Sequence, residues 1–454
     1  MPHRVRLAEI IKALSRALDM TEGQPPGHCI GCCHIGTAIG HSLGLGETEL
    51  RDLYYTLMLK DLGCTSNAAR ICQIYETDDI RFKRNFKLVD GSLAEVLRFL
   101  VRNTAAEAGP VRRAKRLLQA MKNGAENTVE LIRTRCENGA DIARQMRFSD
   151  DVAAGIRDLD EHFDGSGHPL GKVGETIHLF ARIALLAQVV EVFFHEHGPQ
   201  AAVDEIGRRR GTWFDPQVVD AFMKVAANTR FWQDLASPEL EEIVLGSEPG
   251  HQAIMADEDY LDDIALGFAR VIDAKSPYTS GHSSRVAAFT DLIAEQMGLT
   301  EARRRRLKRA ALLHDIGKLG VSNSVLDKPG PLNQDEWQAM RRHAEFSEEI
   351  LSHIAAFADI AAMGGAHHER LDGKGYPRGL KGAEINLDTR ILSTADVFDA
   401  LTADRPYRAA LPVTEALTLL WRDAGLALDP ACISALERGL QQQDQLRGFT
   451  FSGS

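Results

Sequence analysis

Residues 312–318 read LLHDIGK, and this stretch decides how the second half of the chain is interpreted. The helix predicted before it has positions i, i+3, i+4 and i+7 on one face, and these positions hold Leu307, Ala310, Ala311 and His314. His314 therefore emerges on a face that its apolar neighbours mark as buried. Asp315 follows it directly, so a nitrogen ligand and an oxygen ligand stand at one point of the chain.

Further histidines and acids of the same half join this pair: His282, His343, His367, His368 and Asp396, with Asp399 one helical turn further on. Several lie on faces that would otherwise be core, where polar groups are costly unless something compensates them. A pair of metal ions is the natural compensation, and N/O ligands without thiolates favour iron, manganese or a similar first-row ion. The alternative is a set of unrelated buried residues, each with its own hydrogen-bond partner.

Four motifs stand complete and in order in this half: GHSSR (281–285), HDIGK (314–318), HHERLDGKGYP (367–377) and RPYR (405–408). Together they resemble the HD-GYP subgroup of the HD phosphohydrolase superfamily, over about residues 257–445. The resemblance implies an all-helical fold and a metal-dependent phosphodiesterase acting on a cyclic dinucleotide. Cyclic di-GMP and 3′,3′-cyclic GMP-AMP both stay open as substrates, as does a second hydrolysis from linear dinucleotide to mononucleotides.

Site roles also follow from the resemblance. It implies seven metal ligands: His282, His314, Asp315, His343, His367, His368 and Asp396. Asp315 would bridge two divalent ions, iron or manganese. The implied phosphate-holding cations are Lys318, Arg405 and Arg408, and Gly375, Tyr376 and Pro377 would shape the substrate mouth. Asp399 would transfer a proton or act as a hydrogen-bond partner behind the ligands.

One position departs from the family pattern. Members with three metals resemble ExxxH at the first histidine, with a glutamate four residues before it. Here Tyr278 stands at that position, so we expect two metals and not three.

The first half of the chain repeats the second in a degenerate form. Lys60 follows His28 by 32 residues, the interval that separates His282 from His314. In this register Asp61 matches Asp315. Further along, DLDEHFDGSGHPLG (158–171) matches HHERLDGKGYPRGL (367–380) when Asp164 is laid on Asp372. Of the seven ligand positions only His28 and Asp61 survive; the others hold Lys60, Arg135, Leu159, Asp160 and Gln188. A cationic side chain in a ligand position disfavours metal binding.

The sequence therefore predicts two HD-type helical bundles in tandem. Residues 1–235 form a degenerate HD-like domain, 236–256 a linker or short connecting helix, and 257–454 the catalytic domain. The first domain is expected to pack against or dimerise the enzyme, or to hold a regulatory anion or nucleotide near Lys60 and Arg135. A homodimer stays open.

A cluster of cysteines and histidines, PGHCIGCCHIG at residues 26–36, marks the first helix of the degenerate domain. Its spacing does not fit the CxxCH haem motif, and no second cysteine pair stands at zinc-finger spacing. His28 is thus interpreted as the remnant of a ligand, and a thiol site involving Cys32 and Cys64 stays open.

Composition narrows the class of protein. The net charge of −11 argues against a partner that is a nucleic-acid polymer. No apolar run is long enough for a membrane span, and seven unevenly spread cysteines do not form a disulfide framework. We expect a cytoplasmic protein. Two other functions compete with the phosphodiesterase: an inactive HD-GYP signal-binding or interaction module, and an HD-type nucleotidase.

Overall fold

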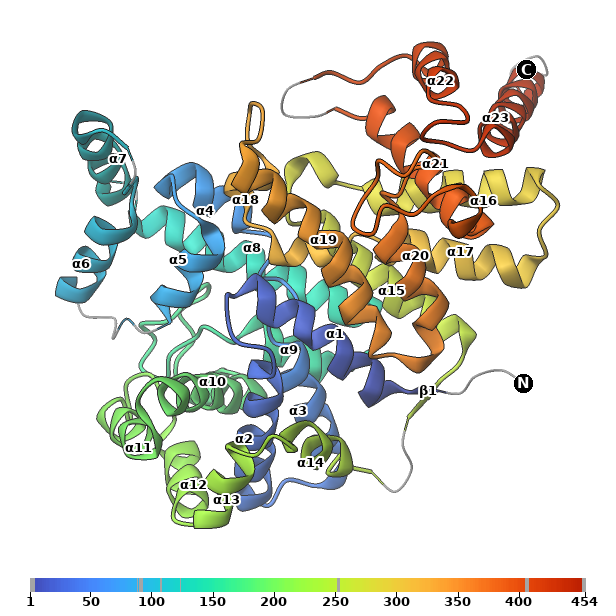
Figure 1. Ribbon diagram of the computed structural model, residues 1–454. Coiled ribbons are helices and arrows are strands. Elements are labelled where there is room, and N and C mark those ends of the chain that lie inside the picture. Colours follow the sequence, from blue (N-terminus) through green and yellow to red (C-terminus); the bar gives the residue numbers. More distant parts are fainter. Residues whose placement is uncertain are drawn as a thin grey trace. The chain divides into compact units, whose positions relative to one another are not determined.

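The computed structural model describes residues 5–87, 89, 93–106, 108–122, 124–250, 254–404 and 408–450 (Figure 1). The chain divides into two compact units. Residues 1–267 with 322–324 form unit 1, and residues 268–321 with 325–454 form unit 2. Helices dominate both units, as the sequence predicts, and the strands β1 (Val5–Arg6) and β2 (Met255–Ala256) form one short antiparallel pair.

Unit 1 begins with the helices that carry the degenerate motifs. Its helices are α1 (Leu7–Thr21), α2 (His28–Leu43), α3 (Glu47–Leu59), α4 (Ala68–Tyr75), α5 (Asp79–Phe86), α6 (Leu93–Asn103), α7 (Pro110–Lys122), α8 (Gly124–Gln145), α9 (Asp150–Arg157), α10 (Leu179–His197), α11 (Pro199–Arg208), α12 (Pro216–Ala226), α13 (Thr229–Leu235) and α14 (Leu240–Gly246). The segment predicted as a linker, residues 236–256, carries α14 and β2.

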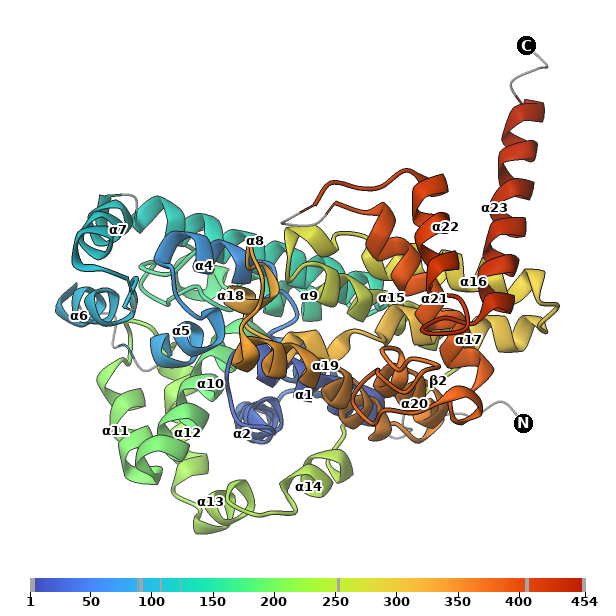
Figure 2. The same ribbon diagram turned by 45° about the horizontal axis from the view of Figure 1, so that its top comes forward.

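Unit 2 continues from α15 (Glu258–Asp273), whose last residues belong to it. Its other helices are α16 (His282–Gln296), α17 (Glu301–Leu313), α19 (Gln334–Ser352), α20 (Ala358–Ala366), α21 (Leu387–Thr402), α22 (Val413–Arg422) and α23 (Pro430–Thr450). The short helix α18 (Asn323–Leu326) is divided between the two units. α16 packs against both α17 and α21, and α16 and α17 lie side by side in both views (Figure 1, Figure 2).

The tandem repeat predicted from the sequence is visible in the order and the ends of the helices. α3 ends one residue before Lys60, and α17 ends one residue before His314. α2 begins at His28 and α16 at His282, each after a glycine in the left-handed region (φ 98° at Gly27). The two copies therefore place corresponding ligand positions at corresponding helix ends.

A backbone contact confirms the register further along. A Cβ built on Gly63 would lie 1.8 Å from the carbonyl oxygen of Arg135. In unit 2, a Cβ on Gly317 would lie 2.0 Å from the carbonyl oxygen of His343. Both positions therefore require glycine for the same close approach, and Arg135 stands where unit 2 has His343.

All seven cysteines lie within the described residues, and all are free, in agreement with the absence of a disulfide framework. Among the helices of the described ranges, none combines the length and apolar character that crossing a membrane requires.

Candidate metal centre

The predicted ligands of unit 2 come from five places in the chain and meet in its core. His282 begins α16, while His314 and Asp315 directly follow α17. Asp396 lies in α21, close to the rings of the first two histidines: its Oδ1 is 3.5 Å from His282 Nε2 and 3.7 Å from His314 Nε2. His282, His314 and Asp396 therefore lie together and form one half of the predicted ligand set.

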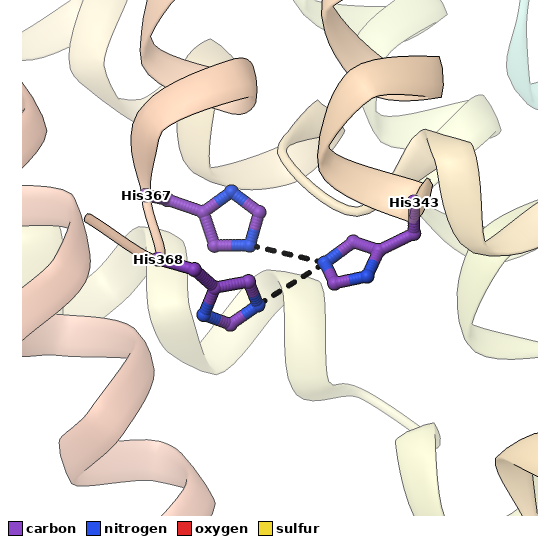
Figure 3. Close-up of side chains that lie close together, drawn as sticks. All are labelled: His343, His367 and His368. Carbon is purple, nitrogen blue, oxygen red and sulfur yellow. Dashed lines mark hydrogen bonds between the residues drawn. The ribbon is translucent and has the colours of Figure 1, made fainter. Parts of the chain in front are cut away.

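The second half of the set consists of three histidines. His343 lies in α19, and His367 and His368 follow α20. The Nε2 atom of His343 is 3.4 Å from that of His367 and 3.1 Å from that of His368 (Figure 3). Three ring nitrogens thus converge on one small volume, as ligands of a single ion would.

Asp315 lies between the two groups, with one carboxylate oxygen facing each. Oδ2 is 3.4 Å from Nε2 of both His282 and His314. Oδ1 is 3.5 Å from Nε2 of His343 and 3.7 Å from Nε2 of His367. This arrangement is the one that a carboxylate shared by two cations requires.

Hydrogen bonds on the far side of the rings fix their orientation. The Nδ1–H groups of three histidines donate to the carbonyl oxygen three residues earlier: His314 to Ala311 (2.7 Å), His343 to Met340 (2.6 Å) and His367 to Gly364 (2.7 Å). Each ring therefore carries its proton on Nδ1 and presents Nε2 as an acceptor. Such hydrogen bonds behind a ligand are a regular feature of metal-binding histidines.

Buried polar atoms without a hydrogen-bond partner also fit a metal ion at this centre. Three buried atoms at the centre have no hydrogen-bond partner: His282 Nε2, His314 Nε2 and Asp315 Oδ1. Burial lowers the pKa of His343 to about 4 and that of His367 to about 3, so both rings are neutral, as ligands must be. Burial alone would raise the pKa of Asp315, but the neighbouring His314 and Lys318 hold this pKa well below its ordinary value. Orphaned acceptors aimed at one point call for a cation.

Two predicted catalytic residues contact this centre differently. Lys318 forms an ion pair with Asp315 Oδ2, with its side chain only 15% exposed. Asp399 is buried, and its carboxylate accepts from His282 Nδ1 (2.7 Å) and from Arg285 Nε (2.6 Å). Because both oxygens are engaged in this way, the geometry favours the orienting role of Asp399 over proton transfer.

Replacing Asp399 by asparagine should weaken metal binding and catalytic activity together, by about 10- to 100-fold, because the hydrogen bond that orients a ligand is weakened. The check is metal affinity measured by competition with a chelator, alongside kcat/KM. The matched control is Asp388→Asn at the start of the same helix, whose carboxylate pairs with Arg303. An unchanged metal affinity with a large loss of kcat would instead support proton transfer.

The loop that contains Gly375, Tyr376 and Pro377, called the GYP loop below, contacts His343 and His368 of the second histidine group. The ring of Tyr376 lies 4.8 Å from that of His368, centroid to centroid, and Tyr376 N–H donates to the carbonyl oxygen of His368 (3.3 Å). A Cβ on Gly375 would lie 2.5 Å from the backbone nitrogen of Arg370, so only glycine fits there. The loop is held by the Glu369 carboxylate, which accepts from the backbone N–H groups of Arg378, Gly379 and Leu380.

An open pocket of about 610 Å³ lies beside this loop. It is lined by Asp335, Gln338, Ala339, Arg341, Arg342, Glu345, Tyr376 and Pro377. The guanidinium of Arg341 lies 5.3 Å from the centroid of the Tyr376 ring and 5.6 Å from that of Trp337. The lining combines two arginines, Arg341 and Arg342, with two acids, Asp335 and Glu345.

The structure gives less information about the phosphate-holding role predicted for the two arginines of the RPYR motif, Arg405 and Arg408. Arg405 lies outside the described residues. Arg408 donates to the carbonyl oxygens of Ala400 (2.7 Å) and Leu401 (2.9 Å) near the end of α21. Its phosphate-holding role stays a prediction.

Sequence reasoning missed Arg285 and Arg341. Arg285 stands in the GHSSR motif, one helical turn after His282, so its position on the ligand face was available from the spacing. Arg341 stands two residues before His343, and nothing in the spacing indicates that it reaches the GYP loop.

Comparison with known proteins agrees with this geometry. The sequence profile of the HD domain matches residues 108–218 and 268–432, in both units. The chain belongs to the HD-domain family. HD-domain phosphohydrolases depend on divalent metals, and the clusters of histidines and acids in unit 2 provide ligands for them.

Several proteins similar to this HD-domain protein are named as cyclic-dinucleotide phosphodiesterases. The 3′3′-cGAMP-specific phosphodiesterase 3 of Vibrio cholerae is 52% identical over 434 residues, which are 96% of this chain and 94% of that protein. A crystal structure of a cyclic GMP-AMP-specific phosphodiesterase from V. cholerae matches with a TM-score of 0.65 at 46% identity, over 97% of this chain and 98% of that one. A cyclic di-GMP phosphodiesterase response regulator of Xanthomonas campestris is 43% identical over 182 residues, 40% of this chain and 48% of that protein.

Proposed function

We propose that this protein is a phosphodiesterase that hydrolyses 3′3′-cGAMP at the centre of unit 2. The observation that carries the proposal is the convergence of the Nε2 atoms of His282, His314, His343 and His367 on the two oxygens of Asp315, 3.4–3.7 Å away. This centre lies beside the GYP loop, which also borders an open pocket with two arginines.

The extent of the similarity supports 3′3′-cGAMP over cyclic di-GMP as the substrate. The relative named for 3′3′-cGAMP aligns over 96% of the chain, including the degenerate unit. The relative named for cyclic di-GMP aligns over 40% of the chain. Similarity to the first thus extends to the whole tandem arrangement.

Two divalent ions, iron or manganese, are proposed for the centre, the first held by His282, His314, Asp315 and Asp396 and the second by His343, His367, His368 and Asp315. The donors are nitrogens and oxygens without a thiolate, which suits these metals. When bound, such ions supply Lewis-acid chemistry, which polarises the phosphodiester and acidifies water. Tyr278 supplies no carboxylate near His282, in keeping with two ions.

The protein's own cations would hold the substrate phosphates. Lys318 lies against Asp315 at the centre and is placed to neutralise charge that builds up on the phosphate oxygens during hydrolysis. Arg341 and Tyr376 border the adjacent pocket, where a second phosphate and a base would lie. Asp399 and Arg285 keep the ring of His282 in place.

Replacing Arg341 by alanine should lower kcat/KM for the cyclic dinucleotide by about 10- to 100-fold, mainly through KM. A charge-assisted hydrogen bond contributes about 1.5–3 kcal/mol to binding, and each 1.4 kcal/mol corresponds to about a factor of ten. Steady-state kinetics check the prediction. Arg306→Ala is the matched control, because Arg306 is exposed on α17 and pairs with Asp359. A loss of kcat at unchanged KM would contradict a binding role.

The proposed function is tested on the full chain, purified anaerobically and loaded with Fe²⁺ or Mn²⁺. Initial rates are measured with 3′3′-cGAMP, cyclic di-GMP and 2′3′-cGAMP, and products are separated by chromatography. We expect 3′3′-cGAMP to be hydrolysed fastest, with the linear dinucleotide as first product. Faster hydrolysis of cyclic di-GMP would overturn the substrate, and no hydrolysis of any cyclic dinucleotide by the loaded protein would overturn the function.

A further inference from the structure

Unit 1 has counterparts of the four residues that form the first half of the metal centre in unit 2, and one of these counterparts is a lysine. The register of the repeat places Lys60 where unit 2 has His314, and Gln188 where unit 2 has Asp396. His28 and Asp61 are retained at the positions of His282 and Asp315. All four residues belong to unit 1.

The ammonium group of Lys60 contacts the counterparts of three metal ligands. Its Nζ donates to His28 Nε2 (3.2 Å), to Gln188 Oε1 (3.2 Å) and to a carboxylate oxygen of Asp61. A lysine ammonium has three N–H donors and no acceptor, so these contacts use all of them. The Lys60 side chain is fully buried.

The support behind the first histidine is also retained. His28 Nδ1 contacts a carboxylate oxygen of Glu191, which stands in α10 where α21 has Asp399. Lys60 can only donate, so its contact with His28 Nε2 is a hydrogen bond when that nitrogen carries no proton, and the Nδ1–H of His28 then donates to Glu191. This is the tautomer that a metal-bound histidine adopts.

In both sites a cation would lie against the corresponding aspartate, Asp61 in unit 1 and Asp315 in unit 2. In unit 2, a divalent ion would face two carboxylates, Asp315 and Asp396. In unit 1, a single positive charge on Lys60 faces one carboxylate, Asp61, and the neutral amide of Gln188. Burial opposes the charged form of Lys60, but Asp61 raises the pKa of the Lys60 amine well above its ordinary value, so the group is charged.

We infer that the Lys60 ammonium occupies the position of the first metal ion in unit 1, and that exchanging Lys60 for histidine and Gln188 for aspartate opens a site for one divalent first-row cation. Arg135, the counterpart of His343, forms an ion pair with Asp160, the counterpart of His368. No N–H of Lys60 is left over to hold an anion.

The test is metal content of the full chain. Wild type, Lys60→His/Gln188→Asp, and the same variant with Asp61→Asn are loaded anaerobically with Mn²⁺, desalted and measured by elemental analysis. We expect one additional ion per chain in the double variant, and the wild-type count in the triple variant. The comparison uses the difference from wild type, so it does not depend on how many ions unit 2 binds or on activity. A folded double variant with an unchanged count would overturn the inference.

A second measurement on the wild-type chain covers the case in which the variants do not fold. Amide hydrogen exchange is followed with and without a chelator. Segments around His282 and His314 should lose protection when metal is removed, and segments around His28 and Lys60 should not change. Chelator-dependent loss of protection around His28 and Lys60 would show a metal in unit 1 and would overturn the inference.

Discussion

Replacing Asp315 by alanine should reduce hydrolysis by about a thousandfold or more. Asp315 presents one oxygen to His282 and His314 and the other to His343 and His367. Its loss removes the only carboxylate that faces both ligand groups in the described part of the centre. Metal ions stabilise the transition state of phosphate hydrolysis by several kcal/mol, and about 4 kcal/mol corresponds to a thousandfold.

The measurement for Asp315→Ala is kcat/KM with 3′3′-cGAMP, together with metal content. Asp359→Ala is the matched control, because Asp359 is an exposed aspartate of the same unit, with its side chain 78% exposed. Circular dichroism should show that both variants keep their helices. Activity of Asp315→Ala within about tenfold of wild type would contradict a shared bridging ligand.

Replacing Lys60 by methionine should destabilise the protein by about 3–5 kcal/mol, the usual cost of leaving one partner of a buried ion pair alone. The Lys60–Asp61 pair is buried, and methionine keeps the length of the side chain without its charge. Adding Asp61→Asn should recover much of this loss, because the second substitution removes the unpaired charge.

Chemical denaturation of wild type, both single variants and the double variant gives the coupling between Lys60 and Asp61. A double variant less stable than Lys60→Met alone would contradict the expected rescue. A Lys60→Met variant within about 0.5 kcal/mol of wild type would show that the ammonium contributes nothing, since changes of that size are ordinary for surface positions.

The helical fold and the ligand set follow from local features of the sequence. His314 ends an apolar helical stripe, and the structure places it directly after α17, with its ring buried. The internal repeat depends on intervals between residues, so it fixes which positions correspond, including Arg135 with His343. Spacing along the chain is enough for such conclusions because helices and tight turns convert sequence intervals into fixed positions.

Contacts between distant side chains are beyond the reach of these patterns. The hydrogen bond from His282 to Asp399 joins α16 and α21. The sequence spacing does not show whether the Asp399 carboxylate forms such a bond or is free to transfer a proton. The direction of Arg408 depends on how its side chain bends back to the end of α21. Glu191 lies in register with Asp399, but its contact with His28 becomes apparent only when α2 and α10 pack together.

The most direct test of a metal-dependent phosphodiesterase centre in unit 2 is a metal titration of the stripped full chain. Hydrolysis of 3′3′-cGAMP is measured while Mn²⁺ or Fe²⁺ is added back, and bound metal per chain is counted at each step. We expect no hydrolysis in the metal-free protein and activity that rises until two ions are bound. Activity of Asp315→Ala should stay about a thousandfold or more below that of wild type. Full hydrolysis by the metal-free protein would contradict the account.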